Sequence, residues 1–94
     1  MFRLWGKIWK DTRLMKDYVV CDDSPKINRT RKVFSAIDSL CYEFDLPKPI
    51  WLDKNIAEFQ RHDRTRFTQD NFIESIPFDA FEIMVIEEDD PFVS

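Results

Sequence analysis

Cations and indoles alternate along the first ten residues of the chain. They are Arg3, Trp5, Lys7 and Trp9. Side chains two residues apart share a face of an extended strand, so we expect these four on one face of a sheet. Indoles can stack on nucleic-acid bases while cations hold phosphates, and Trp and Arg are also enriched at protein-binding hot spots. This set, here called the Trp/cation stripe, is therefore a candidate binding surface.

The distribution of charge favours a protein partner over a nucleic acid. The net charge is −4, and nine Lys and Arg within residues 1–34 are offset by fourteen Asp and Glu within residues 35–94. A continuous basic surface, which nucleic-acid binding requires, is therefore not expected. The sequence favours a protein partner or a homodimer, with Arg64 and Arg66 at the rim of the stripe. A further interpretation is that residues 63–78 fold over the stripe and bury both indoles.

A second cluster of cations lies near the start of an expected helix. It comprises Lys26, Arg29, Arg31 and Lys32. Backbone N–H groups at a helix N-terminus together with cations can hold an anion. The alternative function is therefore nucleic-acid or phosphate binding by the stripe with Arg29, Arg31 and Lys32. The same cations could instead pair with Asp22, Asp23 or the acidic C-terminus.

Catalytic, metal and cofactor sites are not expected. The single histidine, His62, lies beside Asp63, but adjacent helical residues point about 100° apart and seldom form an orienting hydrogen bond. No nucleophile can be assigned to the pair. Cys21 and Cys41 form no C-x-x-C motif, so they are predicted to be buried thiols in a reducing compartment rather than metal ligands. One glycine, Gly6, excludes a glycine-rich phosphate loop.

The elements that position these residues follow from apolar periodicity. Strands are expected over residues 2–10 and 14–21, as a hairpin, and over residues 78–87. Neither face of residues 14–21 is fully polar, so both faces of that strand are expected to be partly covered. A helix is expected over residues 25–44, with a cap signal at residues 22–25, Phe34 in its buried stripe and an end at Pro47 and Pro49. A shorter helix is expected over residues 52–62, with Ile56 and Phe59 pointing inward. Between them, residues 63–78 could contain a short strand at 65–68 or a helical turn at 68–72.

Together these elements predict an α+β domain of ββααβ order. Its small, mainly antiparallel three-stranded sheet carries two helices on one face, which leaves the Trp/cation stripe on the other. Residues 1–86 form the domain, and residues 87–94 form an acidic, frayed tail. No segment approaches the roughly 20 apolar residues of a membrane span, and cations interrupt any signal peptide, so we expect a cytoplasmic protein.

Two segments carry a family resemblance. MFRLWGKIWK and IWLDKNIAEFQRHDRTRFTQDNFIE resemble a family of small, uncharacterised bacterial proteins over nearly the whole chain. The resemblance implies a bacterial, cytoplasmic, single-domain protein and carries no transferable activity, ligand or catalytic residue. The prediction is a small non-enzymatic binding or regulatory module that acts through protein–protein contacts, including self-association.

Overall fold

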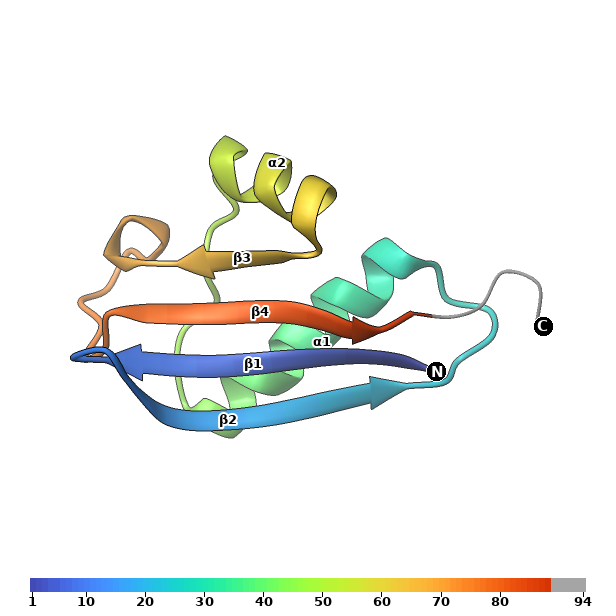
Figure 1. Ribbon diagram of the computed structural model, residues 1–94, viewed down its shortest axis with the longest axis horizontal. Coiled ribbons are helices and arrows are strands. Elements are labelled where there is room, and N and C mark those ends of the chain that lie inside the picture. Colours follow the sequence, from blue (N-terminus) through green and yellow to red (C-terminus); the bar gives the residue numbers. More distant parts are fainter. Residues whose placement is uncertain (89–94) are drawn as a thin grey trace.

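Two helices and a four-stranded antiparallel sheet make up the described part of the chain, residues 1–88 of the computed structural model (Figure 1). The elements, in order, are β1 (Phe2–Lys10), β2 (Arg13–Asp22), α1 (Arg29–Phe44), α2 (Asp53–His62), β3 (Arg64–Phe67), a 3-10 turn (Gln69–Asn71) and β4 (Ala80–Glu87). The sheet order is β2-β1-β4-β3. The first strand and the last therefore lie side by side at the centre of the sheet.

The predicted α+β class with two helices is confirmed, whereas the three-stranded sheet and the ββααβ order are wrong. Arg64–Phe67 adds a fourth strand at the edge, and the turn Gln69–Asn71 follows it. Both alternatives for residues 63–78 are thus present together. β3 alternates exposed arginines with the buried Thr65 and Phe67, but four residues are too few for this alternation to identify a strand in the sequence.

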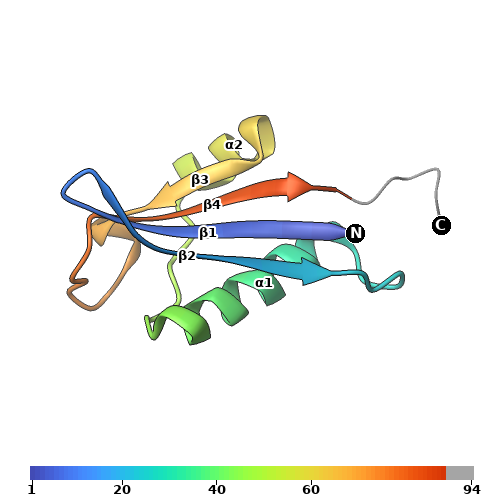
Figure 2. The same ribbon diagram turned by 60° about the horizontal axis from the view of Figure 1, so that its bottom comes forward.

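The core lies between the sheet and α1. The even-numbered side chains of β1, including Leu4, face α1, as do Phe81 and Ile83 of β4. Figures 1 and 2 show α1 on one side of β1 and β4. Gly6 allows the helix to approach, because a Cβ atom there would lie 2.7 Å from both methyl carbons of Leu40. The opposite side of the sheet, which carries the Trp/cation stripe, is here called the open face.

Helix α1 begins later than predicted, at Arg29 rather than near Pro25. Asn28 is the N-cap, and its side-chain oxygen accepts the backbone N–H of Arg31 at 2.9 Å. The earlier cap signal forms a turn instead, in which Asp22 accepts the backbone N–H of Ser24 at 2.8 Å. The sequence contained two competing cap signals, and the asparagine, not the aspartates, starts the helix.

Strand β2 is far more exposed than predicted, because within residues 1–88 it pairs only with β1, on one side. Both of its faces were expected to be partly covered, and Val20 is its one half-buried apolar side chain. The prediction of two buried thiols is accordingly half wrong. Cys21 is exposed, on the open face opposite Arg3, whereas Cys41 is a buried residue of α1.

Helix α2 packs beside the edge strand β3 and is joined to the core by Trp51. The indole of Trp51 packs edge-on against Phe59 of α2, with ring centroids 5.5 Å apart, and against Phe67 of β3, at 5.1 Å. Phe59 is buried as predicted, whereas Ile56, also predicted to point inward, is 42% exposed. The helix is therefore held by Trp51 and Phe59 rather than by a continuous apolar stripe.

The predicted acidic tail lies only partly within the described residues. β4 extends through Glu87, and Glu88 follows it, whereas Asp89 and Asp90 lie outside the described residues. Within residues 1–88, no helix is both long and apolar enough to cross a membrane. The same residues contain no group of three His, Cys, Asp or Glu side chains placed to hold a metal ion.

Candidate protein-binding face of the sheet

The open face brings the predicted stripe and its predicted rim together. In the register of the sheet, Lys7 of β1 lies opposite Glu82 of β4, and Arg66 of β3 lies opposite the same glutamate. Arg64 is on the same face as Arg66, two residues before it. Residues 64–67 extend the sheet edge instead of folding over the stripe, and Trp5 and Trp9 are both half-buried. The indoles are thus not buried under residues 64–67, although the guanidinium of Arg66 lies over the ring of Trp9.

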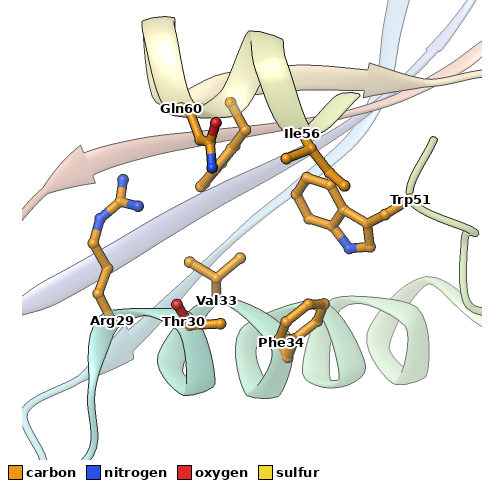
Figure 3. Close-up of a pocket in the computed structure, with 8 residues that line it drawn as sticks. Arg29, Thr30, Val33, Phe34, Trp51, Ile56 and Gln60 are labelled. Atoms are coloured by element: carbon orange, nitrogen blue, oxygen red, sulfur yellow. The ribbon is translucent and has the colours of Figure 1, made fainter. Parts of the chain in front are cut away.

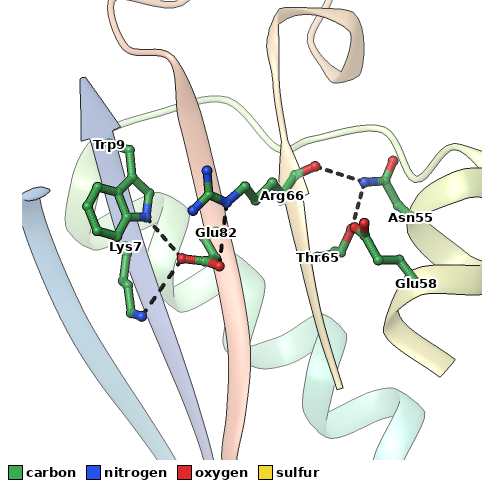
Figure 4. Close-up of polar contacts among 7 residues, drawn as sticks. All are labelled: Lys7, Trp9, Asn55, Glu58, Thr65, Arg66 and Glu82. Carbon is green, nitrogen blue, oxygen red and sulfur yellow. Dashed lines mark hydrogen bonds and ion pairs between the residues drawn. The ribbon is translucent and has the colours of Figure 1, made fainter. Parts of the chain in front are cut away.

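Glu82 lies at the centre of the open face and binds three neighbours (Figure 4). Its Oε1 accepts the indole N–H of Trp9 at 3.0 Å and lies 3.8 Å from Nζ of Lys7. Its Oε2 lies 3.5 Å from Nε of Arg66. Glu82 and Lys7 are only 7% and 9% exposed. A buried carboxylate is therefore the shared counter-charge of both cations at the middle of this face.

The same cations also hold the two indoles. Nζ of Lys7 lies 3.7 Å from the ring centroid of Trp5, and the guanidinium of Arg66 lies 5.6 Å from that of Trp9. Cation–π contacts of this kind contribute about 0.5–2 kcal/mol each. The alternation of cation and indole in β1 is thus explained by contacts within the face, which orient both rings.

Two further acids pair with the stripe nearer its ends. The indole N–H of Trp5 donates to Asp17 of β2 at 3.0 Å, in an exposed position. Nε of Arg3 lies 2.8 Å from Oε2 of Glu87, and both side chains are nearly half exposed. The open face is therefore amphipathic and close to neutral. Sequence reasoning missed Glu82, although a lone acid inside the otherwise apolar strand β4 was the available signal.

The cations at the start of α1 do not join this surface. Arg29 donates through Nη2 to Asp63 at 2.7 Å and through Nε to Glu88 at 2.8 Å. Lys32 is 3% exposed, and Arg31 is exposed to solvent. Because α1 covers the other side of the sheet, Arg29, Arg31 and Lys32 lie apart from the Trp/cation stripe. These cations were predicted to pair with Asp22, Asp23 or the acidic C-terminus. Arg29 does so, because it bonds to Glu88 near the start of the acidic tail.

A groove between α1 and α2 was not predicted (Figure 3). It encloses about 300 Å³ and is lined mostly by apolar side chains, with Trp51 at one end and Arg29 and Gln60 at the other. It exists because Phe34 and Ile56, both expected in the core, remain 50% and 42% exposed. Phe34 packs edge-on against Trp51, at 6.0 Å between centroids, and so forms one wall.

His62 lies at the end of α2 beside a polar depression along β3. Within residues 1–88 it makes no hydrogen bond with Asp63, whose carboxylate pairs with Arg29. The one buried hydroxyl beside this depression, that of Thr65, donates to Glu58 and accepts from Asn55. Thr65 thus ties β3 to α2.

No protein-family model, curated protein or solved structure matches this chain. The resemblance to small bacterial proteins therefore stays a prediction.

Proposed function

We propose that the protein is a non-enzymatic module that binds another protein through the open face of its sheet. The contact residues are the Trp/cation stripe with Arg64 and Arg66. One observation carries the proposal: the indoles of Trp5 and Trp9 remain half-buried on a face that no helix within residues 1–88 covers, while the central cations are paired with Glu82.

The charge balance of the face favours a protein over a nucleic acid. A phosphate would have to compete with Glu82 for Lys7 and Arg66, and that carboxylate is 7% exposed. Half-buried indoles beside paired arginines are, by contrast, the composition of hot spots in protein interfaces. Nucleic-acid or phosphate binding, the alternative, would need the cations at the start of α1, and these lie on the other side of the sheet.

Trp5→Ala is the sharpest variant for testing the face. The indole N–H of Trp5 bonds to the exposed Asp17, so truncation leaves no buried polar group without a partner. Trp9→Ala would instead remove a donor to the buried Glu82 and lower stability. Tyr42→Ala is the matched control, because Tyr42 is an aromatic residue of α1 that is 87% exposed.

The immobilised chain and both variants are used to capture proteins from a bacterial lysate, and each bound protein is quantified. We expect a partner that the wild type and Tyr42→Ala retain equally and that Trp5→Ala loses at least about tenfold. Thermal unfolding checks that Trp5→Ala is folded. Equal capture by Trp5→Ala would contradict the proposal.

Titration with labelled single-stranded DNA and RNA tests the alternative function, nucleic-acid binding. Binding carried by several phosphate contacts weakens by about 10³–10⁵-fold between about 50 and 200 mM salt. We expect no such binding by the wild type. Salt-sensitive binding that Arg31→Ala abolishes would support the alternative function instead.

A further inference from the structure

Strand β2 is a long, exposed edge of the sheet, although it carries charged residues such as Lys16 and Asp17. It is ten residues long, lies at the end of the sheet order and, among residues 1–88, pairs only with β1. Figure 1 shows it as the outermost strand at the bottom of the view. Apolar side chains are exposed on both of its faces: Leu14, Met15, Tyr18 and Val19 are 36–55% exposed. Long edges of this kind invite pairing with another strand, because their outer N–H and C=O groups lack partners.

The opposite edge of the sheet, strand β3, is protected against pairing with another strand, in contrast to β2. β3 has only four residues, and α2 packs along it. Asn55 and Glu58 of α2 both bond to Thr65 of β3, and arginines occupy the alternate positions. Short length, charged residues and a covering helix are the usual protections of an edge. β2 contains no proline, and its one bulge, at Met15, lies near the hairpin turn.

We infer that β2 pairs antiparallel with β2 of a second copy of this chain, about a two-fold axis at Val19. The bulge-free stretch, residues 16–22, has Val19 at its midpoint. An axis there places Val19 opposite its own copy and Tyr18 opposite Val20, so apolar side chains meet in the middle. This pairing goes beyond the proposed function, since it uses the edge of the sheet rather than its open face.

The charges along β2 favour a second copy in this register. Lys16 and Asp22 lie at opposite ends of the stretch, so antiparallel self-pairing places each opposite the other. Moving the axis to Asp17 would set two aspartates directly against each other, and moving it to Lys16 would set two lysines together. The sequence of the edge is thus complementary to itself about Val19.

The symmetry of this pair determines where the open faces lie. Opposed residues of an antiparallel pair point to the same side of a sheet, so the two-fold axis is perpendicular to the sheet. Both copies of the Trp/cation stripe then lie on the same side of one continuous sheet. Two copies of one partner site would face the same direction, which strengthens binding to a partner that carries two contact sites.

The test is the oligomeric state of the full chain, measured by sedimentation equilibrium. We expect a dimer for the wild type. Val19→Lys opposes two ammonium groups at the axis and should raise the dimer dissociation constant about tenfold or more. Leu14→Lys is the matched control, because Leu14 is equally apolar, is 44% exposed and lies outside residues 16–22. It should remain dimeric.

Disulfide cross-linking tests the register and does not depend on the folding of Val19→Lys. In the Cys21→Ser background, Val19→Cys places two thiols on the axis, where directly opposed Cα atoms are about 4.5–5.5 Å apart and can be bridged. We expect a cross-linked dimer after mild oxidation, and none for Leu14→Cys in the same background.

A monomeric wild type would overturn the inference, as would a dimer that survives Val19→Lys or that Val19→Cys fails to cross-link. A dimer lost in Trp5→Ala but kept in Val19→Lys would show pairing through the open face and would also overturn it. A monomeric wild type that still captures a partner through Trp5 would remove the edge pairing and leave the proposed function standing.

Discussion

The indole N–H of Trp9 donates to Oε1 of Glu82 at 3.0 Å, across 73 residues of sequence. The bond joins the central strands β1 and β4 on the open face, and Lys7 and Arg66 pair with the same carboxylate. Glu82 therefore orients the indole of Trp9 on the open face and supplies the negative charge beside Lys7 and Arg66. Cations that suggested a phosphate site in the sequence are balanced once β4 lies beside β1.

Glu82→Gln tests the central role of this carboxylate. The amide can still accept from Trp9, but Lys7, which is 9% exposed, loses its counter-charge. We expect a loss of about 2–4 kcal/mol in the free energy of unfolding, measured with urea. Glu87→Gln is the control, because the exposed pair of Glu87 with Arg3 should contribute less than about 1 kcal/mol. Equal losses for the two variants would show that Glu82 is an ordinary surface acid.

Gly6→Ala tests the close approach of α1 to the sheet. The new Cβ would lie 2.7 Å from the methyl carbons of Leu40, which is fully buried and has little room to move. We expect a destabilisation of about 1–3 kcal/mol. Leu40→Ala alone should cost about 2–5 kcal/mol through its cavity. The double variant should cost clearly less than the sum, and strict additivity would mean that the two residues do not collide.

Asn55→Ala tests the polar network that joins α2, β3 and the 3-10 turn. The buried amide of Asn55 donates to Thr65 and to the carbonyl of Arg66, and it accepts from Leu52 and Asn71. Its removal leaves several buried groups without partners, so we expect a loss of about 2–4 kcal/mol.

The N-cap of α1, Asn28, provides the comparison for Asn55→Ala. Asn28→Ala removes one exposed capping bond to Arg31 and should cost about 0.5–2 kcal/mol. Urea unfolding of both variants gives the ranking. A loss for Asn55→Ala no larger than that for Asn28→Ala would mean that water replaces the network easily.

The reactivity of Cys41 follows from its burial. The pKa of the Cys41 thiol is raised from 9.0 to about 11, chiefly by burial and also by the nearby Asp38 carboxylate, while Lys48 partly offsets the rise. A shift of two pKa units lowers the thiolate fraction near neutral pH about 100-fold. In Cys21→Ser protein, alkylation of Cys41 should be at least that much slower in the native state than in urea. Similar rates would show that the thiol is open to solvent.

The same shift makes stability depend on pH. Between pH 9 and about 11 the unfolded chain loses the Cys41 proton while the folded chain keeps it. The contribution of the thiol to stability is therefore complete below pH 9 and is lost as pH rises through about 11. Cys41→Ala should lose less stability than the wild type over this interval in paired urea titrations, and parallel curves would contradict the assignment.

Several features of the fold could be predicted because they depend on neighbours in the chain. Two-residue alternation in β1 identified the faces of the strand, and Pro47 with Pro49 correctly placed the end of α1 near Phe44. The start of α1 was missed because two cap signals lie within one stretch, and choosing between them requires the tertiary contacts of the preceding turn. β3 was only one of two alternatives because four residues give too short a pattern.

The α+β class, the alternation of the Trp/cation stripe and its position on one face of β1 could all be predicted from the sequence. These are local properties, fixed by the geometry of an extended backbone and by the prolines that end a helix. The tertiary structure was needed to show that Glu82 is the shared counter-charge of Lys7 and Arg66, and that β2 is an edge strand within residues 1–88. Each of these depends on which strands become neighbours, and strand pairing is a contact between distant residues that no local pattern encodes.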